Sequence, residues 1–122
     1  MPWTLNNDRP LYLQLMERIQ MDIISEKYQA GDKLPSVRDL ALEASVNPNT
    51  MQKALSELER NGLVFSKRTS GRFITEDKEL LKQLKHDRVI ELIKEFIDKM
   101  KALGFPEDEI IALLNKTWKE VN

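Results

Sequence analysis

The fold of this chain is decided by the stretch VNPNTMQKALSELERNG, which occupies residues 46–62. Asn47 is a favourable helix N-cap, and Pro48 follows at the first helical position, where its missing N–H costs nothing. Asn61 and Gly62 are residue types that end helices in the left-handed conformation. The stretch therefore predicts one helix that begins at Pro48 and ends just before Asn61.

The predicted helix has two unlike faces, because residues three and four apart lie on the same side of a helix. Its apolar stripe consists of Met51, Ala54, Leu55 and Leu58. Its polar side is almost free of acids and carries Asn49, Gln52, Lys53, Ser56 and Arg60. Amide side chains can pair with the donors and acceptors of base edges, whereas Lys53 can only donate, which suits phosphate or guanine. The polar face therefore predicts contact with DNA.

A first helix is expected to start near Pro10. Apolar residues recur there every four positions, at Leu11, Leu15, Ile19 and Ile23. The helix should end near Tyr28, because residues 30–32 are turn-like. Trp3 and Tyr12 are expected to cover this helix.

A second, short helix and a hairpin flank the predicted reading helix. Ser36 can cap the short helix, with Asp39 three residues later. Residues 63–65 and 72–74 predict two strands, and the basic segment 66–71 between them forms the tip of the hairpin. The order helix, helix, turn, helix, hairpin is the plan of a winged helix-turn-helix, which places its third helix in the major groove.

Charge is unevenly distributed along the chain, although the net charge is only −1. Residues 46–75 have five basic and two acidic side chains, a local balance of +3, whereas residues 76–122 have nine basic and eleven acidic ones. A phosphate-facing surface is therefore expected in the middle of the chain. Lys67 and Arg68 in the hairpin tip are candidates for it.

The C-terminal segment predicts a pair of helices. Near-heptad spacing marks one packing stripe, formed by Val89, Ile93, Phe96, Met100 and Leu103. Gly104 should end the first helix and Pro106 should begin the second, in which Leu114 and Trp118 are apolar. We expect these apolar side chains to form a homodimer interface, which would join two DNA half-sites. The alternative is a helical protein-interaction module for which DNA binding is secondary.

Composition excludes several other classes of protein. The 122 residues contain no cysteine, which removes disulfides and thiolate chemistry. His86 is the only histidine and lacks companions at ligand spacing, and the acidic residues 107–109 suit a helix start, so we expect no metal and no cofactor. No catalytic motif is present, which argues against an enzyme. Without a signal peptide or an apolar span, the chain is expected to be cytoplasmic, with no membrane association.

Three motifs resemble the GntR family of bacterial regulators: GDKLPSVRDLA at 31–41, VNPNTMQKAL at 46–55 and NGLV at 61–64, followed by GRFI. The short tail is similar to that of the YtrA subfamily, whose members lack large effector domains. The resemblance implies that DNA-contacting positions correspond to Arg38, Asn47, Asn49, Thr50, Gln52 and Gly71. A surface salt bridge of Arg38 with Asp39 or Glu43 is the alternative for that arginine.

The sequence thus predicts a mainly α protein with a small β-hairpin wing. Residues 1–75 are expected to form the winged helix-turn-helix and residues 76–122 a helical dimerisation region. The predicted function is a repressor that binds a pseudo-palindromic double-stranded operator as a homodimer, with the small-molecule effector left open. The expected DNA-binding residues are Ser36, Arg38, Asn47, Asn49, Thr50, Gln52, Lys53, Lys67, Arg68 and Gly71, and the expected dimer-interface residues are Val89, Ile93, Phe96, Met100, Leu103, Leu114 and Trp118.

Overall fold

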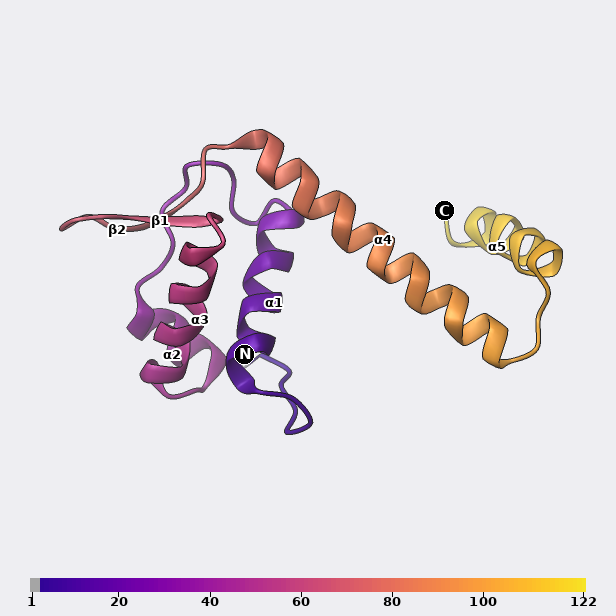
Figure 1. The fold of residues 1–122 in the computed structure, drawn as a ribbon, viewed down its shortest axis with the longest axis horizontal. Helices are drawn as coiled ribbons and strands as arrows, with labels where there is room; N and C mark the ends of the chain where they lie inside the picture. The colour runs from indigo at the N-terminus through magenta and orange to yellow at the C-terminus, as the bar shows by residue number, and fades with distance from the viewer. Residues whose placement is uncertain (1–2) are drawn as a thin grey trace. The chain divides into compact units, whose positions relative to one another are not determined.

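The computed structural model describes residues 3–122 and is mainly helical with one hairpin, as the sequence predicted (Figure 1). Its elements, in chain order, are α1 (Leu11–Ile24), α2 (Val37–Ala44), α3 (Pro48–Arg60), β1 (Val64–Lys67), β2 (Gly71–Ile74), α4 (Lys78–Ala102) and α5 (Glu107–Val121). The chain forms two compact units, one ending at Lys85 and the other comprising His86–Asn122. Within residues 3–122, none of the helices combines the length and apolar character that crossing a membrane requires.

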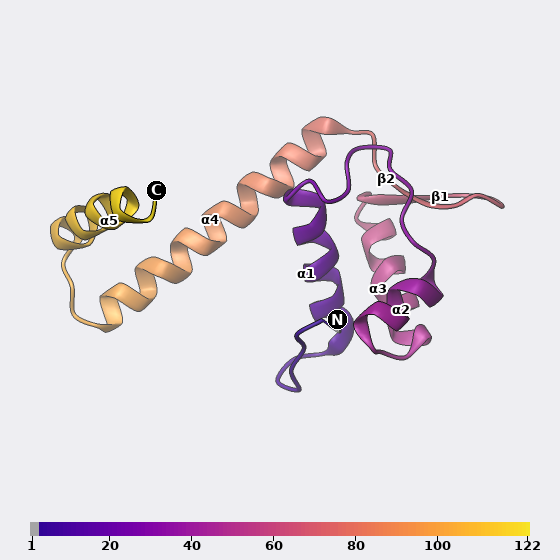
Figure 2. The same cartoon turned by 180° about the vertical axis from the view of Figure 1, so that it is seen from behind.

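Helix α3 is the centre of the first unit and packs on α1, α2 and β1. Figures 1 and 2 show α1, α2 and α3 side by side. The predicted apolar stripe of α3 is fully buried, with Leu58 and Met51 both 0% exposed. Around it lie Leu15 and Ile19 of α1 and Leu40 of α2, so one apolar core holds the three helices together.

Helix α1 ends earlier than the sequence predicted. The expected end near Tyr28 is wrong, because Glu26 adopts a left-handed φ of 66° directly after the last turn. The backbone N–H groups of Lys27 and Tyr28 then both donate to the carbonyl of Asp22, at 2.8 and 3.3 Å. The chain thus turns back against the helix end instead of extending it.

The end of α1 is tied to α2 by a chain of ion pairs. Asp22 is buried and pairs with Arg18 at 3.2 Å and Lys27 at 3.7 Å. Lys27 also lies 3.6 Å from Glu43 on α2. Trp3 was expected to cover the first helix, and it is 6% exposed with its ring 4.7 Å from the guanidinium of Arg18 on α1.

The hairpin has longer strands than expected and a third partner. The antiparallel ladder runs from Val64 opposite Ile74 to Lys67 opposite Gly71, so only residues 68–70 form the turn. Segment 31–34 pairs with the other side of β2: the N–H of Gly31 donates to the carbonyl of Ile74 at 3.0 Å. The sequence assigned residues 30–32 only to a turn, because one isolated bridge leaves no period-two pattern to read.

The C-terminal helices lie where the sequence predicted them. Gly104 ends the first of them with a φ of 85°, and Pro106 precedes the second. None of the residues of α4 or α5, all of which the structure describes, is buried. Leu80, Leu81 and Leu84 in the first turns of α4 are partly buried against the main core. The apolar side chains from His86 onward form no buried core of their own.

Replacement of Leu58 by alanine tests the role of the α3 stripe. Because Leu58 is fully buried, the lost contacts and the cavity should lower the free energy of unfolding by about 2–5 kcal/mol. Chemical denaturation measures the change. Leu42→Ala is the matched control, since Leu42 is 73% exposed on α2 and should be nearly neutral. Equal losses for both variants would contradict the assignment of the core.

Candidate nucleic-acid interface

The start of α3 presents the side chains that the sequence predicted for base reading. Asn47 Oδ1 accepts a hydrogen bond from the backbone N–H of Asn49 at 2.8 Å, which confirms the predicted cap. Pro48 occupies the first turn and directs no polar group outward. Asn47, Asn49 and Gln52 are exposed, whereas Thr50 is half-buried. The cap uses the side-chain oxygen of Asn47 and leaves its amide nitrogen for other partners.

Two polar side chains of α3 are already engaged within the protein. Gln52 Nε2 donates to Ser56 Oγ at 3.3 Å. The ammonium group of Lys53 lies 4.0 Å from the centre of the Tyr12 ring on α1. Cation–π contacts at exposed sites contribute only about 0.5–1 kcal/mol. A phosphate or base edge can therefore replace these internal partners at little cost.

Ser36 and Arg38 lie at the N-terminal end of α2. Ser36 Oγ accepts a hydrogen bond from the backbone N–H of Asp39 at 3.1 Å, so the predicted cap is confirmed. Arg38 is exposed and, within residues 3–122, forms no ion pair. The salt bridge considered for it is thus absent, and Glu43 pairs with Lys27 instead. The guanidinium remains available to an external anion.

The wing presents Arg68 to solvent and holds Lys67 against its own aromatic rings. Arg68 is exposed in the turn, as predicted. Lys67 belongs to β1 instead of the tip, and its ammonium group lies 4.6 Å from the centre of the Phe73 ring. Phe73 in turn stacks on Phe65, with their centroids 5.8 Å apart. Lys67 is therefore a positioned cation at the side of the wing.

Glu59 joins the wing to α3. Its Oε1 atom accepts a hydrogen bond from Ser66 Oγ at 2.8 Å and pairs with Arg72 Nε at 3.2 Å. Sequence reasoning did not select Glu59, because an acid on a helix does not reveal which strand residues lie opposite it. The contact fixes the orientation of the hairpin relative to the reading helix.

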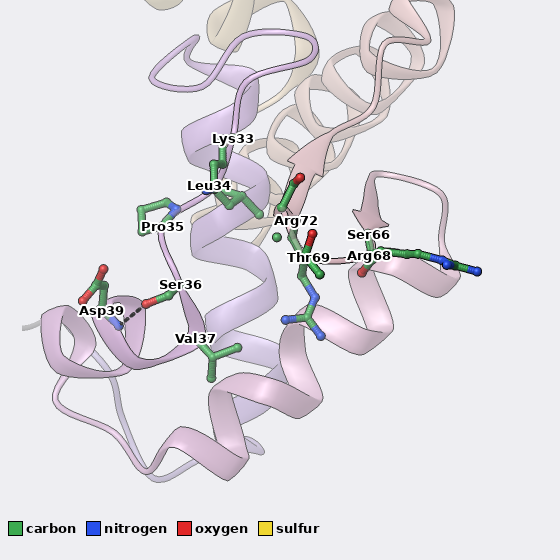
Figure 3. A pocket seen from close by; sticks show the side chains of 12 residues that line it. Lys33, Leu34, Pro35, Ser36, Val37, Asp39, Ser66, Arg68, Thr69 and Arg72 are labelled. Carbon is green, nitrogen blue, oxygen red and sulfur yellow. Dashed lines mark hydrogen bonds between the residues drawn. The ribbon is translucent and has the colours of Figure 1, made fainter.

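An open groove of about 790 Å³ lies between the start of α2 and the wing (Figure 3). Ser36 lines it from the α2 side, and Arg68 and Arg72 line it from the hairpin. Lys33 adds a further cation that sequence reasoning missed. Asp39 is the one carboxylate among its described lining residues. The groove thus combines three cations with the positive end of a helix.

Gly71 has a conformational role in this groove. Its φ is 104°, in the region that side-chain-bearing residues rarely adopt. A Cβ atom at this position would lie 3.2 Å from Cε of Lys33. Glycine therefore permits both the strand geometry after the turn and the close passage of Lys33.

No cluster of three or more histidine or acidic residues suited to a metal ion occurs among residues 3–122. His86, the histidine considered in the sequence, is exposed on α4. Residues 107–109 occupy the first turn of α5, where negative charge favours the helix dipole.

The segment that forms the winged helix-turn-helix matches a known family. The model for "Bacterial regulatory proteins, gntR family" covers residues 11–74, from the start of α1 to the end of β2. This chain belongs to the GntR family. It is therefore a DNA-binding transcription regulator with a winged helix-turn-helix, and its relatives are regulators, not enzymes.

Two curated relatives of this GntR regulator come from Bacillus subtilis (strain 168). The uncharacterized HTH-type transcriptional regulator YhcF is 39% identical over 114 residues, which cover 93% of each chain. The HTH-type transcriptional repressor YtrA is 38% identical over 89 residues, covering 72% of this chain and 68% of YtrA. These matches extend beyond the winged helix and identify a YtrA-type regulator.

Solved structures agree with this membership. A GntR family transcriptional regulator from Listeria monocytogenes has a TM-score of 0.84 and 39% identity, covering 92% of this chain and 98% of that one. The DNA-binding domain of AraR, solved in complex with operator ORX1, has a TM-score of 0.56 and 26% identity, covering 59% of this chain and 93% of that one. The shared fold thus includes a protein solved on operator DNA.

Substitution of Asn47 separates its capping role from a DNA contact. Asn47→Ala should lower the free energy of unfolding by about 1 kcal/mol, because the N–H of Asn49 loses its acceptor. Asn47→Asp should keep the stability, since aspartate also caps, but should weaken binding to DNA by placing a negative charge at the helix start. Thermal denaturation and gel shifts measure the two effects. Unaltered DNA binding by Asn47→Asp would restrict this residue to the cap.

Proposed function

We propose that this protein is a homodimeric repressor whose two α3 helices read the half-sites of a pseudo-palindromic operator. The observation that carries the proposal is the exposed, acid-free start of α3, opposite a fully buried apolar face. Asn49 and Gln52 are its base readers, because amides can pair with a base edge through two hydrogen bonds. Asn47, Thr50 and Lys53 contact the phosphates beside them.

The groove between α2 and the wing receives the sugar-phosphate backbone. Ser36 lies at the α2 N-terminus, where backbone N–H groups and the helix dipole favour an anion. Lys33 and Arg68 supply positive charge on the same groove. Among residues 3–122, Arg38 has no ion pair that DNA binding would have to break. Lys67 contacts the DNA backbone from the side of the wing. Gly71 permits the hairpin conformation that this contact needs.

Residues 76–122 form the dimerisation part of the protein, and residues 1–75 form the DNA-binding part. The exposed apolar side chains from His86 onward support the dimerisation role, since unit His86–Asn122 buries none of its helical residues. Residues 76–85 belong to the compact unit that ends at Lys85 and connect the two parts. Units of fewer than about 40 residues usually need disulfides, metals or association to be stable. A second copy of the chain provides the missing apolar surface.

The predicted interface residues divide into two groups. Phe96, Met100 and Leu114 line a small apolar cavity of about 210 Å³ between α4 and α5, so they also join these two helices. Val89, Ile93, Leu103 and Trp118 are between 45% and 67% exposed and line no such cavity. These four side chains are therefore free to contact the partner subunit without opening the contact between α4 and α5.

A repressor acts where its operator lies, and the bacterial chromosome lies in the cytoplasm. We therefore infer that the protein is cytoplasmic. The YtrA-type relatives support repression, since B. subtilis YtrA is named a transcriptional repressor.

DNA-contact variants test the reading surface. An operator is first obtained by selection from random double-stranded DNA with the purified protein. Arg38→Ala and Gln52→Ala should each weaken binding by about 1–3 kcal/mol, because charged or paired hydrogen bonds are lost. Gel shifts measure the change, and Lys119→Ala on α5 is the charge-matched control for Arg38. Unchanged affinity of both variants would disprove these contacts.

The wing lysine should behave differently from the reading helix. Lys67→Ala should reduce the slope of log affinity against log salt concentration by about 1, with little change in base preference. Fluorescence anisotropy at several salt concentrations measures this slope. An altered base preference with an unaltered slope would assign Lys67 to base reading.

A charge placed on the α4 stripe tests the dimer. Ile93→Lys should convert the protein to a monomer, because the partner would have to bury an unpaired ammonium group. Glu95→Lys is the control, since this position lies on the polar side of α4 and should leave the dimer intact. Sedimentation at micromolar concentration distinguishes the two states. A monomeric wild-type protein would refute dimerisation.

A further inference from the structure

A second cavity lies between the end of α1 and the first turns of α4, within the unit that ends at Lys85. Figures 1 and 2 both show these two segments beside each other. The cavity has a volume of about 460 Å³, within the range of about 300–1,000 Å³ typical of small-molecule sites. None of its lining residues belongs to the groove between α2 and the wing.

The cavity combines an apolar wall with a cationic rim. Ile23, Ile24 and Ala30 line it from the end of α1 and the following turn, and Leu81 lines it from α4. Leu81 also packs against the main core, so this wall is anchored. A ligand with an apolar body would therefore gain burial here.

Three lysines of α4 line the same cavity. Lys78, Lys82 and Lys85 are spaced by four and three residues, which places them on one side of the helix. Within the described part of the chain, none of the three forms an ion pair. Glu26 is the single carboxylate among the described lining residues. The described lining residues thus carry three positive charges and one negative charge.

Tyr28 also lines the cavity. Burial raises the pKa of its hydroxyl above the ordinary value, which already lies well above neutral pH. Lys27, which lies over the Tyr28 ring, also pairs with Glu43 on α2. The cavity wall is thus connected to the helix that carries Arg38.

We propose that this cavity binds a small organic anion, in which a carboxylate or phosphate group meets Lys78, Lys82 and Lys85 and an apolar body lies against Ile23, Ile24 and Leu81. The ligand is an effector candidate for the regulator, but the site itself is independent of operator binding. Its test therefore contains no DNA, and its failure would leave the proposed repressor function untouched.

Amide NMR titration of the full-length protein with phenyl phosphate tests the site. Saturable shifts should appear in residues 23–30 and 78–85. Inorganic phosphate, which lacks the apolar body, and benzyl alcohol, which lacks the charge, should each bind at least about tenfold more weakly. Absence of saturable shifts with phenyl phosphate would overturn the proposal, as would equally tight binding of benzyl alcohol.

Lysine variants locate the anion-binding group. The triple variant Lys78→Gln, Lys82→Gln, Lys85→Gln should weaken phenyl phosphate binding about tenfold, since each exposed charge pair contributes up to about 1 kcal/mol. Replacement of the same three lysines by arginine should retain binding. This result would show that the glutamine variant loses affinity through lost charge, not through misfolding. The matched control is Lys94→Gln, Lys99→Gln, Lys101→Gln, farther along α4. Equal affinity of the first triple variant and this control would refute the site.

Discussion

Burial of one face of α3 is the interaction on which the rest of this structure depends. Met51, Ala54, Leu55 and Leu58 are almost completely removed from solvent, between α1, α2 and β1. Because the side chains of a helix project around its whole circumference, burying this stripe turns the polar face outward. The proposed readers Asn49 and Gln52 are thus exposed as a consequence of core packing, and their helix starts where Asn47 caps it.

The orientation of the wing depends on contacts with two other segments of the chain. Segment 31–34 pairs with β2, and Glu59 of α3 holds Ser66 and Arg72. Together they fix the hairpin relative to the start of α2, and the groove between them follows from this arrangement. Gly71 makes the same arrangement sterically feasible, because its missing side chain leaves room for Lys33.

The two units differ in how completely they bury their own apolar side chains. The winged helix has a closed core, whereas α4 and α5 contain no buried residue, and Trp118 is 67% exposed. An exposed apolar surface of this kind is typical of association. The lysine-rimmed cavity at the beginning of α4 belongs to the closed unit, so ligand binding there would not require the tail to be rearranged.

The sequence by itself determined the type and order of nearly all elements, because capping residues and helical periodicity are local signals. It predicted the caps Asn47 and Ser36, the buried stripe of α3 and the break at Gly104. It failed at the end of α1 and did not reveal the partners of Glu59, the strand pairing of residues 31–34 or the place of Lys33. These features join residues far apart in the chain, so only the tertiary structure, in which packing brings them together, decided them.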